Sequence, residues 1–446
     1  MTTDLTKGPI KTHLAKLSIP AITGYFFHTL FNVTDTFFAG LISTQALAAL
    51  SLSASIFFMI LAIAIGMSEA LTSLVGNALG EKDLPKARRI ALNGIAMGMF
   101  LSIFLAIFGI ASAPYFVQAL GDSSYVVQTL DYVNVILYAT IFFIGSFFFN
   151  ALLNATGDTV SFRNVLIATA ALNVALDYIF VVYLGFGVKG VATATVVSEF
   201  ATMAYLFYKL RKTTLWSGFQ AFEYDFGIIK ELFKQGFGPS MNMFMMAFGM
   251  YVITYFVAPY GKEAVAAFGI GMRIEQIFLM PVVGLSVATL AIVSQNNGAK
   301  LYDRVSPTAN LAIKYGFIMS GVGVASFYLF GEFFASLLTS DAKVIEQSVL
   351  YLRVCGFAFF GFVMIFVYIS TLQGVGKPAV IFPISVYRQV VAPVLLFSLF
   401  GFFDFSVWSI WLGLDAIIFS AAIYLRWRFK RELEKVISTL PSDRQY

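Results

Sequence analysis

The sequence contains very few of the residues that build disulfide frameworks and most metal centres. Among 446 residues there are one cysteine, Cys355, and two histidines, His13 and His28. A single cysteine excludes an internal disulfide and any cysteine-rich metal site. Charged residues are also scarce, at 12% of the chain against about 25% in an average soluble domain. Most of this chain is therefore expected to avoid water.

Apolar residues replace what is missing. They make up 59% of the chain, and the mean hydropathy is +0.83. A helix needs about 20 apolar residues to cross a bilayer, where each backbone polar group must bond internally. Twelve runs meet this requirement and are predicted to be spanning helices: roughly 14–38, 46–77, 87–118, 126–153, 162–183, 190–210, 232–258, 264–295, 308–337, 343–372, 379–401 and 405–426. The N-terminus lacks a signal-peptide core, so we expect the first helix to direct insertion.

Lysine and arginine are distributed unevenly between the loops that these helices leave. If both termini are cytoplasmic, most of the 29 basic residues fall on the cytoplasmic side. They gather in the N-terminal arm, after residue 80, around the midpoint and in the C-terminal tail. This is the positive-inside distribution of a membrane protein. The net charge of +5 is therefore explained by topology, and no nucleic-acid partner is expected.

The chain repeats itself at an offset of 218 or 219 residues. The matching pairs include Ala46 and Ala264, Gly66 and Gly284, Gln128 and Gln347, Tyr132 and Tyr351, Gly157 and Gly376, and Pro20 and Pro239. Because each half holds an even number of helices, both halves enter the membrane from the same side and the repeat is parallel. Parallel halves that rock around a central cavity are a common design for alternating access. A transporter is therefore expected, although a purely structural duplication would leave the same trace.

The repeat predicts the fold class and the domains. We expect an all-α integral membrane protein with twelve transmembrane helices in two six-helix bundles. The predicted division is an N-lobe of residues 1–210, a connecting segment of residues 211–231 on the cytoplasmic surface, a C-lobe of residues 232–430 and a cytoplasmic tail of residues 431–446.

One carboxylate distinguishes the first half. Asp35 shares a helical face with Tyr25, His28 and Asn32 in an otherwise apolar helix. A charge at the bilayer centre costs about 2.5–3.5 kcal/mol on insertion scales, so this face is predicted to turn into the bundle. A set of interhelical hydrogen bonds would have the same pattern.

Two further helices of this half supply polar groups that favour a functional reading. Asn173 and Asp177 are four residues apart, and so are Thr195 and Glu199. Two neighbouring carboxylates in a nonpolar environment cannot both ionise cheaply, so such a pair can exchange a proton or hold a monovalent cation. The repeat carries Asp35 onto Thr254. Coupling chemistry is therefore predicted in the first half alone.

The other intramembrane charges and the prolines lead to weaker hypotheses. Glu69 is expected to reach cytoplasmic water, Arg273 and Glu275 to form a structural network, Arg388 to pair with Asp415, and Cys355 to serve packing. Pro20 and Pro239 each lie early in the first helix of a half. Proline removes a helical hydrogen bond, so each is either a static bend or a hinge.

These motifs resemble the MATE family, the multidrug and toxic compound extrusion transporters, over essentially the whole chain. The most specific segments are GMSEALTSLVGNALGEKD, NALLNATGDT, LNVALDYIF and GVATATVVS in the first half and AVAAFGIGMRIEQIFLMPVVGLSVATLAIVSQNNGA in the second. The resemblance implies two bundles that form a V around a central cavity. It also implies cation-coupled export of organic, often cationic and amphipathic compounds across a bacterial inner membrane.

The resemblance also extends to particular residues. The family's N-lobe coupling site corresponds here to Asp35, Tyr132, Asn173, Asp177 and Thr195, and its helix 1 proline to Pro20. The acidic residues that NorM-type members have in helices 7 and 10 are missing. In this respect the chain looks like the DinF-like branch, which implies proton coupling through the N-lobe.

The sequence thus predicts a monomeric multidrug efflux transporter that exchanges drugs and dyes for protons through Asp35. No metal and no cofactor are expected beyond the proton gradient or a monovalent cation. The alternatives are a sodium-coupled exporter of the same family and a flippase for a lipid or lipid-linked sugar, which would favour a strongly basic cavity. A membrane-embedded enzyme is not expected, because clustered acids or histidines at an interface are missing. A passive channel does not account for the duplicated bundles.

Overall fold

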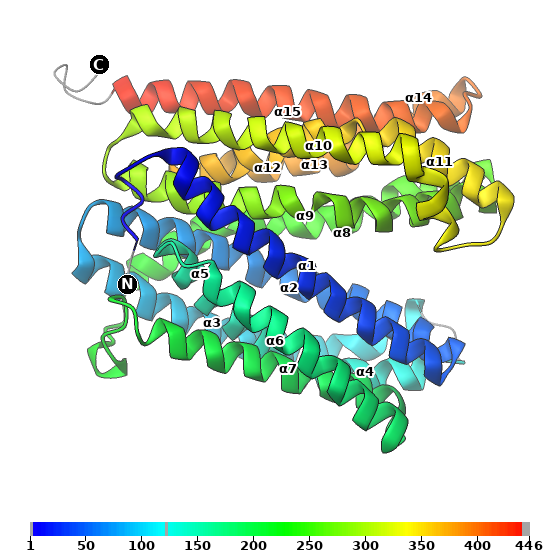
Figure 1. The fold of residues 1–446 in the computed structure, drawn as a ribbon, viewed down its shortest axis with the longest axis horizontal. Coiled ribbons are helices and arrows are strands. Elements are labelled where there is room, and N and C mark those ends of the chain that lie inside the picture. Colours follow the sequence, from blue (N-terminus) through cyan, green and yellow to red (C-terminus); the bar gives the residue numbers. More distant parts are fainter. Residues whose placement is uncertain (1–2, 121–123, 439–446) are drawn as a thin grey trace.

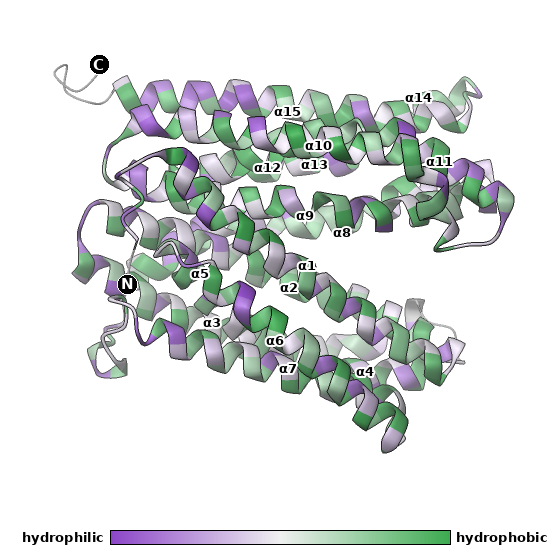
Figure 2. Cartoon of the chain, viewed as in Figure 1, coloured by the Kyte–Doolittle hydropathy of each residue, from purple (hydrophilic) through white to green (hydrophobic). Residues whose placement is uncertain are grey.

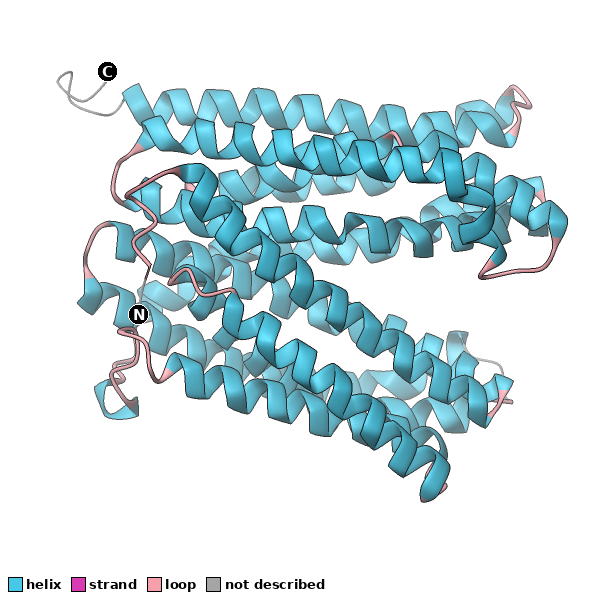
Figure 3. Cartoon of the chain, in the orientation of Figure 1, coloured by secondary structure: helices cyan, strands magenta, loops and turns pink. Residues whose placement is uncertain are grey.

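The computed structural model describes residues 3–120 and 124–438, and over these ranges the regular structure is helical throughout. The helices form two groups that lie close together near the chain termini and diverge toward the other end (Figure 1). Most loops lie at the two ends of the helix bundles, as Figure 3 shows. The names N-lobe and C-lobe, taken from the predicted division, are used below for α1–α7 and α8–α15.

The helices of the N-lobe follow the predicted spans closely. They are α1 (Ile10–Ile42), α2 (Thr44–Gly80), α3 (Leu84–Leu120), α4 (Val126–Tyr138), α5 (Thr140–Ala155), α6 (Val160–Asp177) with the π-helical η1 (Tyr178–Tyr183), and α7 (Gly187–Leu210). A connecting stretch with the short η2 (Phe219–Ala221) leads to the C-lobe.

The C-lobe begins six residues before the predicted boundary at residue 232. Its elements are α8 (Phe226–Val257), η3 (Ala258–Tyr260), α9 (Lys262–Gly298), η4 (Tyr302–Arg304), α10 (Val305–Ser336), α11 (Ala342–Cys355), α12 (Ala358–Gly374), η5 (Pro378–Val380), α13 (Ile381–Val386), the π-helical η6 (Tyr387–Val391), α14 (Ala392–Phe402) and α15 (Val407–Ser438). The predicted tail overlaps the end of α15, and residues 439–446 lie outside the described residues.

The number of spans agrees with the prediction once bent helices are joined. Nine helices of the described chain are long and apolar enough to cross a membrane, and two bent pairs raise the number to eleven. The polar residues of α1 lower its hydropathy, and this 33-residue helix is the twelfth segment. The bends of 48° between α4 and α5 and of 51° between α11 and α12 interrupt segments predicted as single spans. They occur at corresponding positions of the repeat, because Ala139 plus 218 is Phe357.

Hydrophobic residues make up most of the length of the helices, and hydrophilic residues are more frequent toward their ends (Figure 2). On α3 the exposed rings of Phe100, Phe104 and Phe108 stack in a row with centroid separations of 6.3 and 6.5 Å. Exposed rings in such a row suit contact with lipid chains, which need no hydrogen bonds from the protein. The helices thus present an apolar belt of the kind that a bilayer requires.

The two lobes meet chiefly where α2 packs against α8 and α9 and where α1 packs against α9. The offset of 218 carries Thr44–Gly80 onto Lys262–Gly298, so these two long helices correspond residue for residue. Glycine permits their close approach: a Cβ atom on Gly80 would lie 2.0 Å from the Gln295 carbonyl oxygen, and one on Gly298 would lie 2.0 Å from the Asn77 carbonyl oxygen. The lobes are therefore sealed at the end near the termini.

Hydrogen bonds across this seal follow the same symmetry. The Asn77 side-chain amide of the N-lobe donates to the Gly374 carbonyl of the C-lobe at 3.0 Å. Its repeat counterpart, Gln295 of the C-lobe, donates to the Ala155 carbonyl of the N-lobe at 2.7 Å. Each lobe thus binds the end of the fourth spanning segment of the other.

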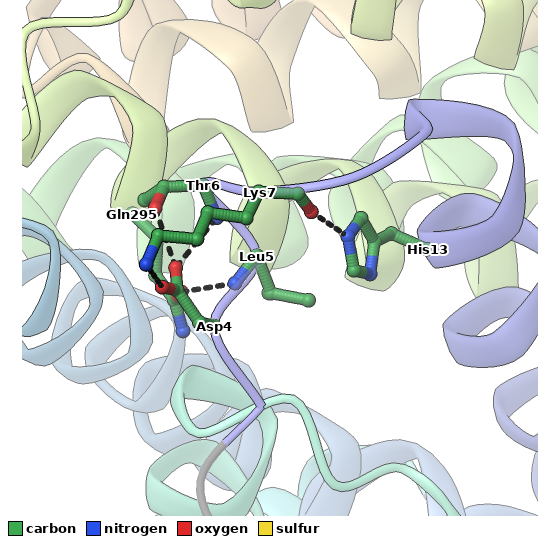
Figure 4. A network of polar contacts seen from close by, with 6 residues as sticks. All are labelled: Asp4, Leu5, Thr6, Lys7, His13 and Gln295. Atoms are coloured by element: carbon green, nitrogen blue, oxygen red, sulfur yellow. Dashed lines mark hydrogen bonds and ion pairs between the residues drawn. The ribbon is translucent and has the colours of Figure 1, made fainter.

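The N-terminal segment crosses the seal. The buried Leu5 donates its backbone N–H to Gln295 Oε1 at 2.9 Å, and Thr3 donates its backbone N–H to the Thr156 carbonyl at 2.9 Å. Figure 4 shows the Leu5 nitrogen directed at the Gln295 side chain and His13 beside the Lys7 carbonyl. Residues that precede the first spanning helix therefore join both lobes.

Candidate functional site

Asp35 lies near the C-terminal end of α1 and is buried within the N-lobe. Its two carboxyl oxygens receive hydrogen bonds from two other helices. Asn173 Nδ2 of α6 donates to Oδ1 at 3.1 Å, and Thr195 Oγ1 of α7 donates to Oδ2 at 2.8 Å. Neutral donors on both oxygens stabilise a carboxylate. Three predicted site residues from three helices are therefore brought together.

Asp177 is the nearest acidic neighbour of Asp35 and is fully buried. Neither of its carboxyl oxygens has a hydrogen-bond partner within the described chain, and the same is true of Asn173 Oδ1. Two adjacent buried carboxyl groups with no basic group beside them cannot both carry a charge at low cost. The arrangement therefore calls for a proton or a bound cation.

Tyr132 of α4 completes the cluster. Its buried side chain lies next to Thr195 and within electrostatic range of both carboxyl groups. The backbone around the second acid is irregular, because Asp177 is the last α-helical residue before the π-helical η1. A π-helical turn inside a helix often marks a functional position. The sequence pattern gave no sign of this change in the helix.

Three of the predicted residues lie apart from the carboxyl pair. Glu199 Oε2 accepts a hydrogen bond from Ser146 Oγ at 3.2 Å instead. His28 stacks on Phe31 at 6.5 Å between ring centroids. Asn32 is exposed, so the prediction that the whole polar face of α1 turns into the bundle is wrong for this residue. Its Nδ2 donates to the His28 carbonyl at 2.9 Å on the same helix, and this local bond removes the need for an interhelical partner.

Pro20 is buried inside α1, and the helix continues through it without interruption. Thr159 Oγ1 donates to the Leu17 carbonyl at 2.9 Å, one turn before the proline. This bond ties the weakened turn to the loop between α5 and α6. Pro239 occupies the matching place in α8 and is also buried. Whether either proline acts as a hinge stays a prediction.

The C-lobe contains an acidic pair that the sequence reasoning missed. Glu275 of α9 and Asp415 of α15 lie within electrostatic range of each other, and Tyr351 of α11 lies beside Glu275. Glu275 Oε1 and Asp415 Oδ1 have no hydrogen-bond partner within the described residues. The sequence signal that could have found this pair is Tyr351, because the repeat carries Tyr132 of the N-lobe cluster onto it.

Two hypotheses about C-lobe residues can be corrected or refined. The proposed ion pair between Arg388 and Asp415 is absent from the ion pairs of the described chain, because the Arg388 guanidinium instead lies over the Phe362 ring, 5.8 Å from its centroid. Cys355 is buried, and its Sγ approaches the Trp411 carbonyl at 3.9 Å. That environment agrees with a packing role.

A cavity of about 260 Å³ lies between the lobes. Its walls come from α1, α2 and α5 on one side and from α8, α9, α12 and η6 on the other. Glu69 of α2 lines this cavity, and its Oε2 accepts a hydrogen bond from Gln373 Nε2 of α12 at 2.7 Å. Glu69 is half-buried at the wall of this cavity, behind the seal between the lobes, and its expected contact with water stays a prediction.

Comparison with known proteins identifies the family. The sequence profile of the MatE family matches residues 20–179 and 240–397, one stretch in each lobe. The chain belongs to the MatE family. It is 28% identical to a probable multidrug resistance protein NorM of Thermotoga maritima, over 96% of this chain and 94% of that protein. It is 25% identical to the probable multidrug resistance protein YoeA of Bacillus subtilis, over 84% of this chain and 83% of that protein.

A solved structure also matches. A MOP superfamily transporter from Pyrococcus furiosus superposes with a TM-score of 0.93 at 24% identity, over 97% of this chain and 99% of that one. This likeness confirms the MATE fold of twelve spanning helices. MatE proteins are transporters of the membrane, so the chain is a multi-pass transport protein and not an enzyme. The relatives' names do not address the predicted DinF-like branch, which stays a prediction.

The described part of this MatE chain contains no group of three or more histidine, cysteine, aspartate or glutamate side chains that could hold a metal ion together.

Proposed function

We propose that this MatE protein is a multidrug exporter that exchanges organic compounds for protons by alternating access, coupled through Asp35. The observation that carries the proposal is the buried pair of Asp35 and Asp177, whose second member has no hydrogen-bond partner within the described chain. Asn173 and Thr195 donate to Asp35 and stabilise it as the charged member of the pair. A single shared proton would satisfy the second member.

The cycle follows from these bonds. When Asp35 takes up a proton on the outward-open side, its oxygens become weaker acceptors for Asn173 and Thr195. The contacts that hold α1 against α6 and α7 then loosen, α1 bends at Pro20, and the compound leaves. Closure of the outer opening and separation of the seal let the proton escape to the cytoplasm, where the next compound loads.

The proposed orientation places both termini in the cytoplasm. It is supported by the clustering of lysine and arginine in the loops at the end where the termini lie. In this orientation the two lobes diverge toward the outside. One proton that crosses a membrane potential of about 150 mV releases roughly 3.5 kcal/mol. This free energy is enough for a concentration ratio of a few hundredfold for a neutral exported compound.

Sodium coupling is the second candidate. It is favoured by the oxygen atoms around the pair, because Asn173 Oδ1 and both Asp177 oxygens lack partners within the described residues and are of the type that binds a monovalent cation. A lipid-linked sugar flippase is less well supported. One basic side chain, Arg388, is found among the described residues that line the cavity.

Efflux in everted vesicles tests the proposal. A fluorescent dye is added outside three sets of vesicles. One set is more acidic inside than outside, one has a higher sodium concentration inside than outside, and one has neither gradient. We expect the proton gradient to drive uptake in the wild type and to fail in Asp35→Asn. Asp131→Asn is the matched control, because Asp131 lies at the surface of the same lobe and pairs with Lys189 at 3.1 Å. Uptake driven by sodium alone would overturn proton coupling, and normal uptake by Asp35→Asn would remove Asp35 from the mechanism.

A further inference from the structure

The cavity between the lobes has one charge of each sign, and the two charges belong to different lobes. Glu69 of α2 and Arg388 of η6 are the charged side chains among the described lining residues. The rest of the polar lining is uncharged and includes Ser68, Thr72, Asn150, Asn154, Asn242, Ser286, Ser370 and Gln373. Neither charged group is found in an ion pair of the described chain. Both charges therefore remain available to a ligand.

Of the two charged residues, Arg388 is the stronger indication of a ligand site. Its side chain is 6% exposed, and its one described contact of a polar or aromatic kind is the Phe362 ring. A cation at the depth of the membrane is costly and is found where it meets a partner or a transported group. The guanidinium is built to bind a carboxylate or phosphate through two parallel hydrogen bonds. Its position in the π-helical turn Tyr387–Val391 also fits a functional site.

Glu69 supplies the opposite charge on the facing wall. One of its oxygens, Oε2, is held by Gln373 of the C-lobe at 2.7 Å, which fixes the carboxylate at the lining of the cavity. Phe147, Phe366, Met243 and Met246 form apolar parts of the same walls. Aromatic rings and thioethers suit contact with a flat aromatic body.

We infer that the cavity recognises small aromatic zwitterions, whose carboxylate binds Arg388 and whose ammonium group lies toward Glu69. The inference rests on the proposed function, since it assumes that the cavity is on the transport path, and it narrows the substrate class from organic cations in general. The cavity volume of about 260 Å³ lies just below the range of about 300–1,000 Å³ typical of drug pockets, so the compound is small.

Three forms of one fluoroquinolone test the inference on the purified full-length protein. Norfloxacin is a zwitterion, its methyl ester is a cation, and its N-acetyl derivative is an anion. Equilibrium dialysis measures the three dissociation constants at neutral pH without any gradient. We expect the wild type to bind norfloxacin about tenfold more tightly than either derivative, the effect of one good charged hydrogen-bonding contact.

Variants then assign each end of the ligand. Arg388→Gln is expected to bring norfloxacin and its methyl ester to equal affinity, and Arg388→Lys to restore part of the difference. Glu69→Gln is expected to bring norfloxacin and the N-acetyl derivative to equal affinity. The matched control is Arg273→Gln, which removes the same charge from an exposed position of α9 outside the cavity lining and should keep the wild-type ratio.

The outcomes separate this inference from the proposed function. Equal wild-type affinities, or an unchanged ratio in Arg388→Gln, would overturn the zwitterion site. Loss of all three ligands by both Arg388→Gln and Arg388→Lys would overturn it too, because the lysine variant keeps the charge. A wild type with the tenfold preference but with no proton-driven uptake in vesicles would support the site and refute the proposed coupling.

Discussion

The N-lobe and the C-lobe each hold two acidic side chains near a tyrosine at the same position of the repeat, yet the two pairs are built from different helices. Asp35 and Asp177 lie on α1 and α6 beside Tyr132. The pair beside Tyr351 comes from α9 and α15. The duplicated backbone has therefore kept one tyrosine and changed where its acidic neighbours come from.

The difference matters because of what each pair touches. α1 packs against α6 of its own lobe and against α9 of the other, so a change at Asp35 reaches both lobes. α15, which carries Asp415, packs on α11, α12 and α14 within the C-lobe. A proton on the first pair can therefore act on α1 directly. The C-lobe pair reaches the N-lobe through α9, which carries Glu275 and packs against α1 and α2.

The largest expected effect comes from exchanging the acids of one lobe at a time. Asp35→Asn with Asp177→Asn should abolish the accumulation of a few hundredfold that one proton can supply, because no carboxyl group is left in the cluster. Glu275→Gln with Asp415→Asn should retain proton-driven uptake. Uptake in everted vesicles measures both. If the C-lobe variant lost uptake and the N-lobe variant kept it, coupling would lie in the C-lobe and the proposed role of Asp35 would be refuted.

The seal between the lobes offers a second comparison. Gly80→Ala and Gly298→Ala each insert a methyl group 2.0 Å from a carbonyl oxygen of the opposite lobe, so both should force the seal open. We expect about a tenfold increase in the rate at which a maleimide added from the cytoplasmic side labels a cysteine placed at Ser286 in the cavity. Gly269→Ala is the control on α9, since open space surrounds it. A different response of the two seal variants would show that α2 and α9 are not equivalent.

Hydrogen bonds across the seal should have a smaller effect. Gln295→Ala removes one bond that joins the lobes, to the Ala155 carbonyl, whereas Asn77→Ala removes two, to the Gly374 carbonyl and from Asn297 Nδ2. A bond of this kind contributes about 1 kcal/mol, so Gln295→Ala should raise labelling of the same cysteine about fivefold and Asn77→Ala somewhat more. In the double variant the two increases in labelling rate should multiply. Gln295→Ala alone also releases the Leu5 backbone, and an effect far above that of Asn77→Ala would assign a separate role to the N-terminal segment.

The smallest expected effect concerns the two prolines. Pro20→Ala restores a helical hydrogen bond in α1 and should lower the rate of proton-driven uptake about threefold, because bending becomes harder. Pro239→Ala makes the same chemical change in α8, which carries no acidic residue at the position corresponding to Asp35. It should leave the rate close to that of the wild type. Equal losses would mean that both prolines serve only packing.

The fold was largely predictable, because its signals are local or periodic. Apolar runs predicted the twelve spanning segments to within about six residues, except that α15 continues to Ser438, twelve residues past the predicted end at 426. The offset of 218 predicted the correspondence of α2 and α9. The bends within two segments were not predicted. A break such as that at Ala139 interrupts the helix over very few residues and leaves the hydropathy of the span unchanged, so an apolar run does not reveal it.

The carboxyl pair of the N-lobe was predictable for a similar reason. Asp35, Asn173 and Thr195 stand on the faces of apolar helices, where a polar side chain needs a partner, and the partners were the other two. Glu199 follows the same rule but found Ser146, since spacing along one helix does not determine which neighbouring helix supplies the partner.

By itself, the sequence determined that the chain crosses the membrane, that its halves correspond, and that polar side chains are present on particular helical faces. These properties depend on composition and on spacing along one helix. Only the tertiary structure decided that Glu275 lies within electrostatic range of Asp415 and that Arg388 lines a cavity instead of pairing with an acid. It also decided that the Leu5 backbone donates a hydrogen bond to Gln295. Such contacts join residues far apart in the chain, and they depend on the rotation and tilt of whole helices, which small residues at the contacts set.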